Sequence, residues 1–168
     1  MKKAVSIFLI GIFPVLAFAA GEHTGGHAAG QMHSGAGQMG SAAHDGNAGR
    51  PGDPAKVSRT IGVSMSDTMR FTPSEIKVKK GETIRFFIKN EGKLPHEMVI
   101  GTMAELKTHA AAMRSMPTMK HAEPNMITLN PGQRGGIVWQ FDKPGTVDFA
   151  CLVPGHLEAG MVGKVEVE

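Results

Sequence analysis

The sequence predicts an all-β fold, a two-sheet antiparallel sandwich that runs from about residue 57 to the C-terminus. Three observations support this prediction. Polar and apolar residues alternate in short segments, as they do in half-buried strands. Turn signals rich in Gly, Pro and Asn separate these segments. Residues 20–56 have a composition that cannot build a core, so the 168 residues allow one domain with appendages.

The first 19 residues have the pattern of a secretory signal peptide. Lys2 and Lys3 precede an apolar run over residues 4–16, and Ala17-Phe18-Ala19 matches a cleavage site. The apolar run is too short for a membrane-spanning helix, which disfavours the alternative of an uncleaved anchor. We therefore expect a periplasmic protein with no membrane anchor after cleavage.

Residues 20–56 form a Gly- and Ala-rich tail without any Val, Ile, Leu or aromatic residue. We predict that this tail is disordered and that residues 50–54 are its linker to the domain. Half of the eight histidines of the chain lie in the tail, together with two methionines. The tail is therefore either a plain tether or a segment that captures copper. Its candidate accessory ligands are His23, His27, Met32, His33, Met39 and His44.

The domain over residues 57–168 contains at least seven segments with strand periodicity. They cover residues 59–65, 75–79, 83–89, 96–100, 135–141, 145–149 and 162–167. One insertion, residues 103–115, is rich in alanine and has the composition of a helix that ends before Pro117. The aromatic residues expected in the core are Phe71, Phe86, Phe87, Trp139, Phe141 and Phe149.

Charge and cysteine content narrow the function. Removal of the signal lowers the Lys and Arg count from 18 to 16 against 15 acidic residues, so the mature chain is nearly neutral. No basic run with interleaved aromatic residues is present, which excludes nucleic acid as the expected partner.

A lone cysteine in an exported protein cannot form an internal disulfide. Cys151 is therefore either a free thiol or a metal ligand.

Four residues form a pattern typical of a copper site. Cys151, His156 and Met161 follow one another at intervals of five residues, and His96 begins an apolar run far upstream. A thiolate and two imidazoles in a plane, with a weak axial thioether, are the ligands of an electron-transfer copper. The alternative is that Cys151 and Met161 are ordinary core residues. In that case all four residues would match the ligand pattern of a copper site by chance.

The strand pattern, the Pro95-His96 pair and the Cys-x4-His-x4-Met loop resemble the cupredoxins, the azurin and plastocyanin superfamily, over residues 57–168. The helical insertion and the tail most resemble periplasmic copper-tolerance cupredoxins of the CopI type. The resemblance implies a Greek-key sandwich with one type 1 copper, as in blue copper proteins. Its ligands would be His96 from a strand end and three residues of the last inter-strand loop. Pro95 stands where azurin has a glycine that offers an extra carbonyl, so we expect four ligands.

Coordination chemistry assigns each ligand a role. Cys151 would supply the covalent thiolate bond, His96 and His156 would complete the plane, and Met161 would tune the reduction potential. We expect Glu97 to hydrogen-bond the ligand loop. The apolar residues around His156 form an expected docking rim for a redox partner protein, although they could simply close the end of the sandwich.

The helical insertion and the segment after it contain a second group of copper-binding residue types. Imidazoles and thioethers are copper ligands, but methionine is equally common as a core filler. These accessory candidates are His109, Met113, Met116, Met119, His121 and Met126.

Two functions fit these observations. The protein is either a copper-tolerance factor or a diffusible one-electron carrier between periplasmic redox enzymes. The tail favours tolerance, because a pure carrier needs only the folded domain. We do not expect an enzyme, since four protein ligands leave no open position for substrate, although oxidation of Cu(I) stays an open alternative. We expect a monomer.

Overall fold

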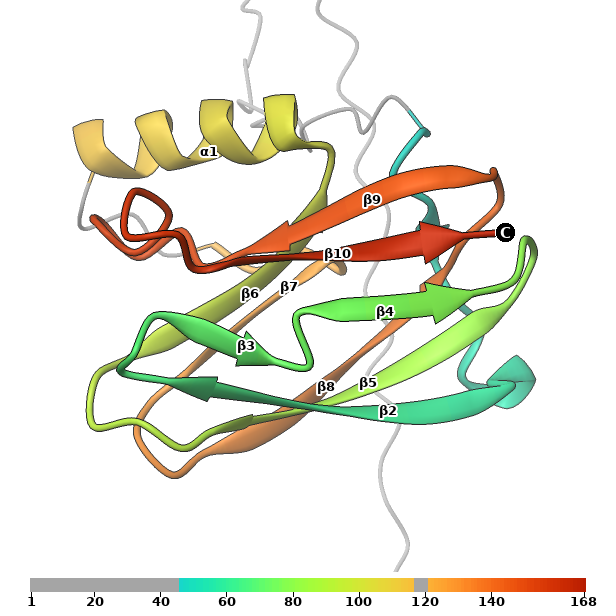
Figure 1. Cartoon of the computed structure of the whole chain (residues 1–168), viewed down its shortest axis with the longest axis horizontal. Helices are drawn as coiled ribbons and strands as arrows, with labels where there is room; N and C mark the ends of the chain where they lie inside the picture. The colour runs from blue at the N-terminus through green and yellow to red at the C-terminus, as the bar shows by residue number, and fades with distance from the viewer. Residues whose placement is uncertain (1–45, 117–120) are drawn as a thin grey trace, which may run out of the picture. The chain divides into compact units, whose positions relative to one another are not determined.

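A computed structural model describes residues 46–116 and 121–168, and these fold as two packed sheets with a helix outside them (Figure 1). The first sheet has the strand order β1 (Arg50–Pro51), β8 (Arg134–Gln140), β5 (Thr83–Asn90), β2 (Arg59–Ser66) and β3 (Arg70–Thr72). The second sheet has the order β4 (Glu75–Val78), β10 (Val162–Val167), β9 (Gly145–Ala150), β6 (His96–Gly101) and β7 (Met126–Leu129). The predicted two-sheet sandwich is confirmed. The predicted signal peptide and residues 20–45 of the tail lie outside the described residues.

Two strand pairs run parallel, which the purely antiparallel prediction did not include. β2 pairs with β5 and β4 pairs with β10, both in parallel. The chain leaves the first sheet after β3, adds β4 to the second sheet and then returns as β5. β2 and β5 therefore become neighbours without a hairpin, and parallel strands need such a crossover. The short edge strands β3 and β7 were not predicted, because so few residues show no clear period.

Strand β5 shows how alternation builds the core. Phe86 is fully buried between the sheets, whereas Phe87 is 45% exposed, so its assignment to the core was wrong. Successive side chains of a strand point to opposite faces, and only one of two adjacent phenylalanines can face the core. On the outer face Phe87 lies between Gly62 of β2 and Gly136 of β8, its register partners in the sheet.

The ordered domain begins earlier than predicted, so the assignment of residues 50–54 to a disordered linker was wrong. Arg50–Pro51 form β1 and pair with β8. Ala48 is buried, and its carbonyl accepts a hydrogen bond of 2.7 Å from Nε1 of Trp139. Asp53 caps the short 3₁₀ helix η1 (Pro54–Lys56). These contacts use backbone groups and small side chains, so a segment without large apolar residues still packs against the sheet edge.

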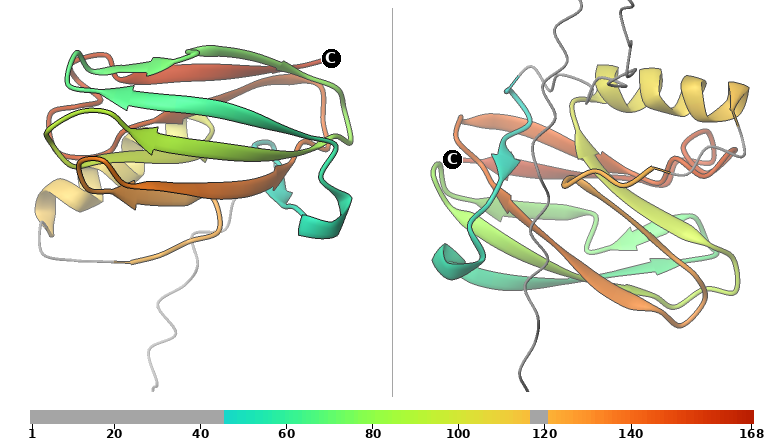
Figure 2. Two further views of the ribbon diagram at one scale, coloured as in Figure 1. Left: turned by 90° about the horizontal axis from the view of Figure 1, so that it is seen from below. Right: turned by 180° about the vertical axis from the view of Figure 1, so that it is seen from behind.

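The helix α1 (Met103–Ser115) has the predicted bounds. It begins with a capping box, in which Thr102 and Glu105 exchange side-chain and backbone hydrogen bonds. The helix lies outside the second sheet (Figure 2). Leu106 and Ala110 of the helix form a buried cluster with Val99, Ala150 and Leu152. The helix is thereby attached to β6 and β9, next to the predicted ligand loop. Within the described residues no helix is long and apolar enough to cross a membrane.

Candidate copper centre

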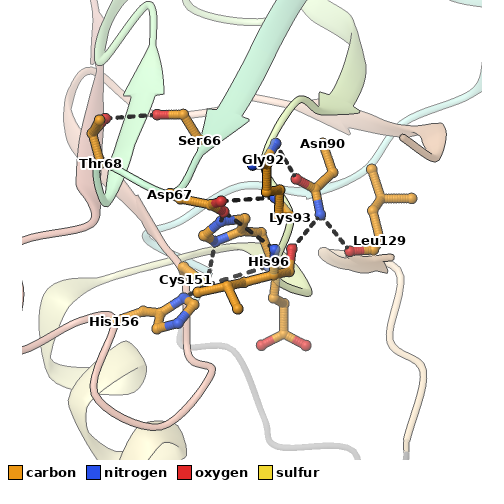
Figure 3. Close-up of polar contacts among 12 residues, drawn as sticks. Ser66, Asp67, Thr68, Asn90, Gly92, Lys93, His96, Leu129, Cys151 and His156 are labelled. Atoms are coloured by element: carbon orange, nitrogen blue, oxygen red, sulfur yellow. Dashed lines mark hydrogen bonds and ion pairs between the residues drawn. The ribbon is translucent and has the colours of Figure 1, made fainter. Parts of the chain in front are cut away.

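Three donor side chains from distant parts of the chain converge where β9 ends (Figure 3). His96 is the first residue of β6, Cys151 directly follows β9, and His156 lies in the loop between β9 and β10. The Sγ of Cys151 lies 3.2 Å from Nδ1 of His156 and 4.0 Å from Nδ1 of His96. All three ligand atoms lie within 4.8 Å of one another, and all three residues are buried.

The spacing of these atoms fits a single metal ion. With bonds of about 2.0 Å to nitrogen and about 2.3 Å to sulfur, two ligands of a trigonal plane lie about 3.8 Å apart. The two observed sulfur–nitrogen distances, 3.2 and 4.0 Å, bracket that value. One soft thiolate with two imidazoles suits copper in both of its oxidation states.

Backbone hydrogen bonds close the loop from Cys151 to Met161. The amide of Cys151 donates to the carbonyl of Met161 at 3.1 Å, and the amide of Met161 donates to the carbonyl of His156 at 3.0 Å. Met161 is fully buried and belongs to the same core cluster as Cys151. The structure thus arranges His96, Cys151, His156 and Met161 for one copper site.

The thiol of Cys151 sits in a strongly desolvated position. Burial raises its pKa to about 11, although the backbone amide of Glu97 donates to the sulfur at 3.3 Å and partly offsets this rise. Burial also lowers the pKa of His156, and the neighbouring His96 adds to that shift. The metal-free site therefore favours a neutral thiol and a neutral imidazole. A bound cation supplies the charge that makes the thiolate stable.

Asp67, which the sequence analysis missed, orients the upstream histidine. Its Oδ1 lies 3.1 Å from Nε2 of His96 (Figure 3). When Nε2 carries the proton and donates to Asp67, Nδ1 is left with a free lone pair on the side of Cys151. A carboxylate behind a ligating histidine fixes the tautomer and the ring orientation in this way. Asp67 and His96 are 29 residues apart, and no sequence motif links them.

The loop before His96 is held from two sides. Asp67 accepts hydrogen bonds from the amides of Lys93 and Leu94, while the buried Asn90 donates to the carbonyls of Leu94 and Leu129. Gly92 lies so close to this network that a Cβ there would come within 2.0 Å of Oδ1 of Asp67. The loop between β5 and β6 therefore requires glycine at this position.

Glu97 is buried beside the site and contacts the ligand loop. Its carboxylate accepts a hydrogen bond of 2.7 Å from the Thr128 hydroxyl and another from the backbone of Leu152, the residue after Cys151. Burial raises the pKa of Glu97 above its usual value, and these hydrogen bonds reduce the shift. Glu97 thereby connects β6, β7 and the start of the ligand loop.

The apolar rim around His156 is narrower than the sequence indicated. Leu152 and Met161 are core residues, which leaves Val153, Pro154 and Leu157 at least partly accessible. Leu94, two residues before His96, is 46% exposed. We define the rim as Leu94, Val153, Pro154 and Leu157.

The structure brings together only part of the accessory group. Nε2 of His109 lies 2.8 Å from Nε2 of His121. Neither histidine belongs to the buried donor cluster at Cys151. Met113 is half-buried, Met116 is exposed after the end of α1, and Met126 packs against the Leu106 cluster as a core filler would. Met119 and the six tail candidates lie outside the described residues.

Comparisons with known proteins agree with this geometry. Residues 57–168 match the family described as copper binding proteins of the plastocyanin/azurin family. The copper-resistant cuproprotein CopI of Rubrivivax gelatinosus is 55% identical over 144 residues, which cover 84% of each chain. The protein of the same name in Pseudomonas aeruginosa is 37% identical over 163 residues, covering 80% of this chain and 90% of that one.

A solved structure gives the same fold. Reduced auracyanin of Roseiflexus castenholzii superposes with a TM-score of 0.56 at 26% identity, covering 67% of this chain and 98% of that chain. The fold and the sequence matches confirm the resemblance drawn from the strand pattern and the cysteine loop, and copper is the cofactor they imply. The chain belongs to the plastocyanin/azurin family of copper-binding proteins.

Proposed function

We propose that this protein is a periplasmic type 1 copper protein that captures copper and handles its redox state in copper tolerance. The observation that carries the proposal is the Cys151 sulfur, buried between the Nδ1 atoms of His96 and His156. Copper held there by a thiolate, two imidazoles and the Met161 thioether could take up and release one electron. Four protein ligands leave no open position for a substrate, so the proposal is binding and electron transfer rather than enzymatic turnover.

The relatives and the N-terminal sequence support tolerance and a periplasmic location. The relatives from R. gelatinosus and P. aeruginosa are both named for copper resistance. The R. gelatinosus match covers 84% of the chain, whereas residues 57–168 are only two thirds of it, so the similarity extends into the sequence before residue 57. That sequence carries the His- and Met-containing tail, which suits copper capture, and the pattern of an export signal.

The rim favours a second candidate function, a diffusible electron carrier. Leu94 and Pro154 are exposed on the two segments that carry His96 and His156, and the rings of these histidines have centroids 4.9 Å apart. A small apolar surface next to a ligand is the kind of interface that weak redox encounters use. A partner protein that docked on the rim would come close to the copper through His156.

Growth of a deletion strain separates the two functions. We expect the strain to become sensitive to copper while its respiration stays normal. Wild type should restore growth on copper, and Cys151→Ser should not. Asp142→Asn, which changes a carboxylate paired with Arg50 on the surface, is the matched control and should restore growth fully. Lost respiratory flux at low copper, with unchanged copper tolerance, would contradict the tolerance role and favour the carrier.

A further inference from the structure

Helix α1 and the segment leading into β7 bring two histidines together outside the buried site. Nε2 of His109 and Nε2 of His121 lie 2.8 Å apart, and the ring centroids are 4.8 Å apart at an interplanar angle of 38°. Both residues are half-buried, so solvent and ions reach them more readily than the fully buried His96. The two positions are 12 residues apart in the sequence, and His121 lies beyond the end of α1. Their contact is therefore made by the fold of the chain after the helix.

The separation of the two nitrogens fits adjacent ligands of one metal ion. With metal–nitrogen bonds of about 2.0–2.1 Å, nitrogens 2.8 Å apart subtend about 90° at the ion. That angle belongs to neighbouring ligands in a tetragonal site, the geometry that Cu(II) prefers. A linear two-coordinate Cu(I) would hold the same nitrogens about 4 Å apart. Among common divalent ions Cu(II) also binds imidazole most tightly.

We propose that His109 and His121 form a second, exchangeable Cu(II) site. Met113, four residues after His109 on the same half-buried helix face, is the thioether placed to join when the ion is reduced. In the described parts of the chain, the only cluster of three or more His, Cys, Asp or Glu donors is the one at Cys151. Two imidazoles without a thiolate hold a copper ion less tightly than the donor set at Cys151, so such a site would release its ion more readily than the buried one.

The second site is connected to the first through Glu97. The Glu97 carboxylate interacts electrostatically with His121, and its backbone amide donates to the sulfur of Cys151. A copper ion at His121 would thus lie within electrostatic range of a buried carboxylate that also contacts the ligand loop. This inference deepens the proposed function, copper handling, but it does not require copper at Cys151.

The test uses the full mature chain carrying Cys151→Ala, which removes the thiolate of the buried site. Paramagnetic Cu(II) broadens the NMR signals of nearby amides. We expect the amide signals of His109, Ala110 and His121 to broaden during Cu(II) titration, alongside those of the tail. His121→Gln keeps a side chain that can hydrogen-bond but is a poor copper ligand, so in that background these α1 signals should stay sharp while the tail signals still broaden. Equal broadening in both proteins, or none in either, would overturn the proposal.

A copper count in the chain with Cys151 intact gives a second measurement. The double variant His109→Gln/His121→Gln should bind one Cu(II) fewer than the parent, and its thiolate-to-copper absorption should be unchanged. If the two histidines form a hydrogen bond only, the double variant binds the same amount of copper and differs only in thermal stability. If the parent shows no thiolate absorption, the proposed function is contradicted. The difference in copper count between the parent and the double variant still tests the second site.

Discussion

Two pairs of histidines in this protein have almost the same ring separation and very different surroundings. The ring centroids of His96 and His156 are 4.9 Å apart, and those of His109 and His121 are 4.8 Å apart. The first pair is buried, presents Nδ1 atoms to a cysteine sulfur and has Asp67 behind one ring. The second pair is half-exposed and presents Nε2 atoms to each other.

The difference shows that proximity of imidazoles does not by itself determine what a site does. A buried thiolate and fixed tautomers favour one tightly held ion that changes oxidation state with little rearrangement. Two accessible imidazoles favour an ion that enters and leaves. The predictions below alter one pair at a time.

The largest expected effect comes from loosening the helix that carries His109. Leu106 is almost fully buried against the outer side of the second sheet, so Leu106→Ala should lower the free energy of unfolding by about 2–5 kcal/mol. Copper binding at the second pair should weaken, because α1 then fits the sheet less closely. Denaturant unfolding and the NMR titration measure these effects. Lys107→Ala, on the exposed side of the same turn, is the control; equal loss in both variants would contradict the account.

The carboxylate behind His96 is the next most sensitive feature of the buried pair. Asp67→Asn removes the charge that fixes the Nε2 proton of His96 and should reduce copper affinity at the buried site about 10–100-fold. Competition with a calibrated chelator measures the change. Glu91→Gln, which alters a surface pair with Lys89, should leave the affinity unchanged. An Asp67 variant that binds copper as tightly as wild type would show that the tautomer is fixed by other contacts.

Proton release distinguishes the two pairs, since only the buried one contains a thiol. Burial raises the pKa of Cys151 to about 11, so at neutral pH the thiol must lose its proton when copper binds. Affinity at this site should therefore rise about tenfold for each unit of pH increase between about pH 7 and 9 and level off above the thiol pKa. Proton uptake by a dye in weakly buffered solution measures the release. A pH-independent affinity would mean that the metal-free site already holds a thiolate.

The smallest expected effect concerns the ion pair that joins α1 to the ligand loop. Arg114 near the end of the helix pairs with Glu158 in the loop, and both side chains are about half exposed. Glu158→Gln should change the free energy of unfolding by less than about 1 kcal/mol, because solvent screens such pairs. The visible spectrum should stay the same. A clear spectral shift would show that this contact positions the copper ligands.

Local patterns in the sequence were enough to predict the loop that carries three of the four candidate copper ligands, and the helix. Cys151, His156 and Met161 lie in one loop, and the alanine-rich segment ends where Pro117 requires it, so neighbouring residues carry enough information. Asp67 could not be predicted, because it reaches His96 only through the packing of two loops. The exposure of Phe87 required knowing which face of β5 meets the second sheet.

The two remaining differences also arise from long-range contacts. The segment containing Ala48 and Arg50 is ordered through the edge of β8 and Trp139, about 90 residues later, which no local composition reveals. In and after the helical insertion, six accessory ligands were predicted, and His109 and His121 are the two that meet in the described structure. Residue types indicated copper chemistry there, and the tertiary fold selected the pair.

The visible spectrum of the mature protein during Cu(II) titration, recorded beside Cys151→Ala, tests the central claim most directly. The account predicts an intense thiolate-to-copper absorption that saturates at one equivalent in wild type and is absent in the variant, while both proteins bind further copper without that band. Copper binding by wild type without the thiolate absorption would contradict the account, because Cys151 would then not be a ligand and the protein would hold copper through histidine and methionine alone.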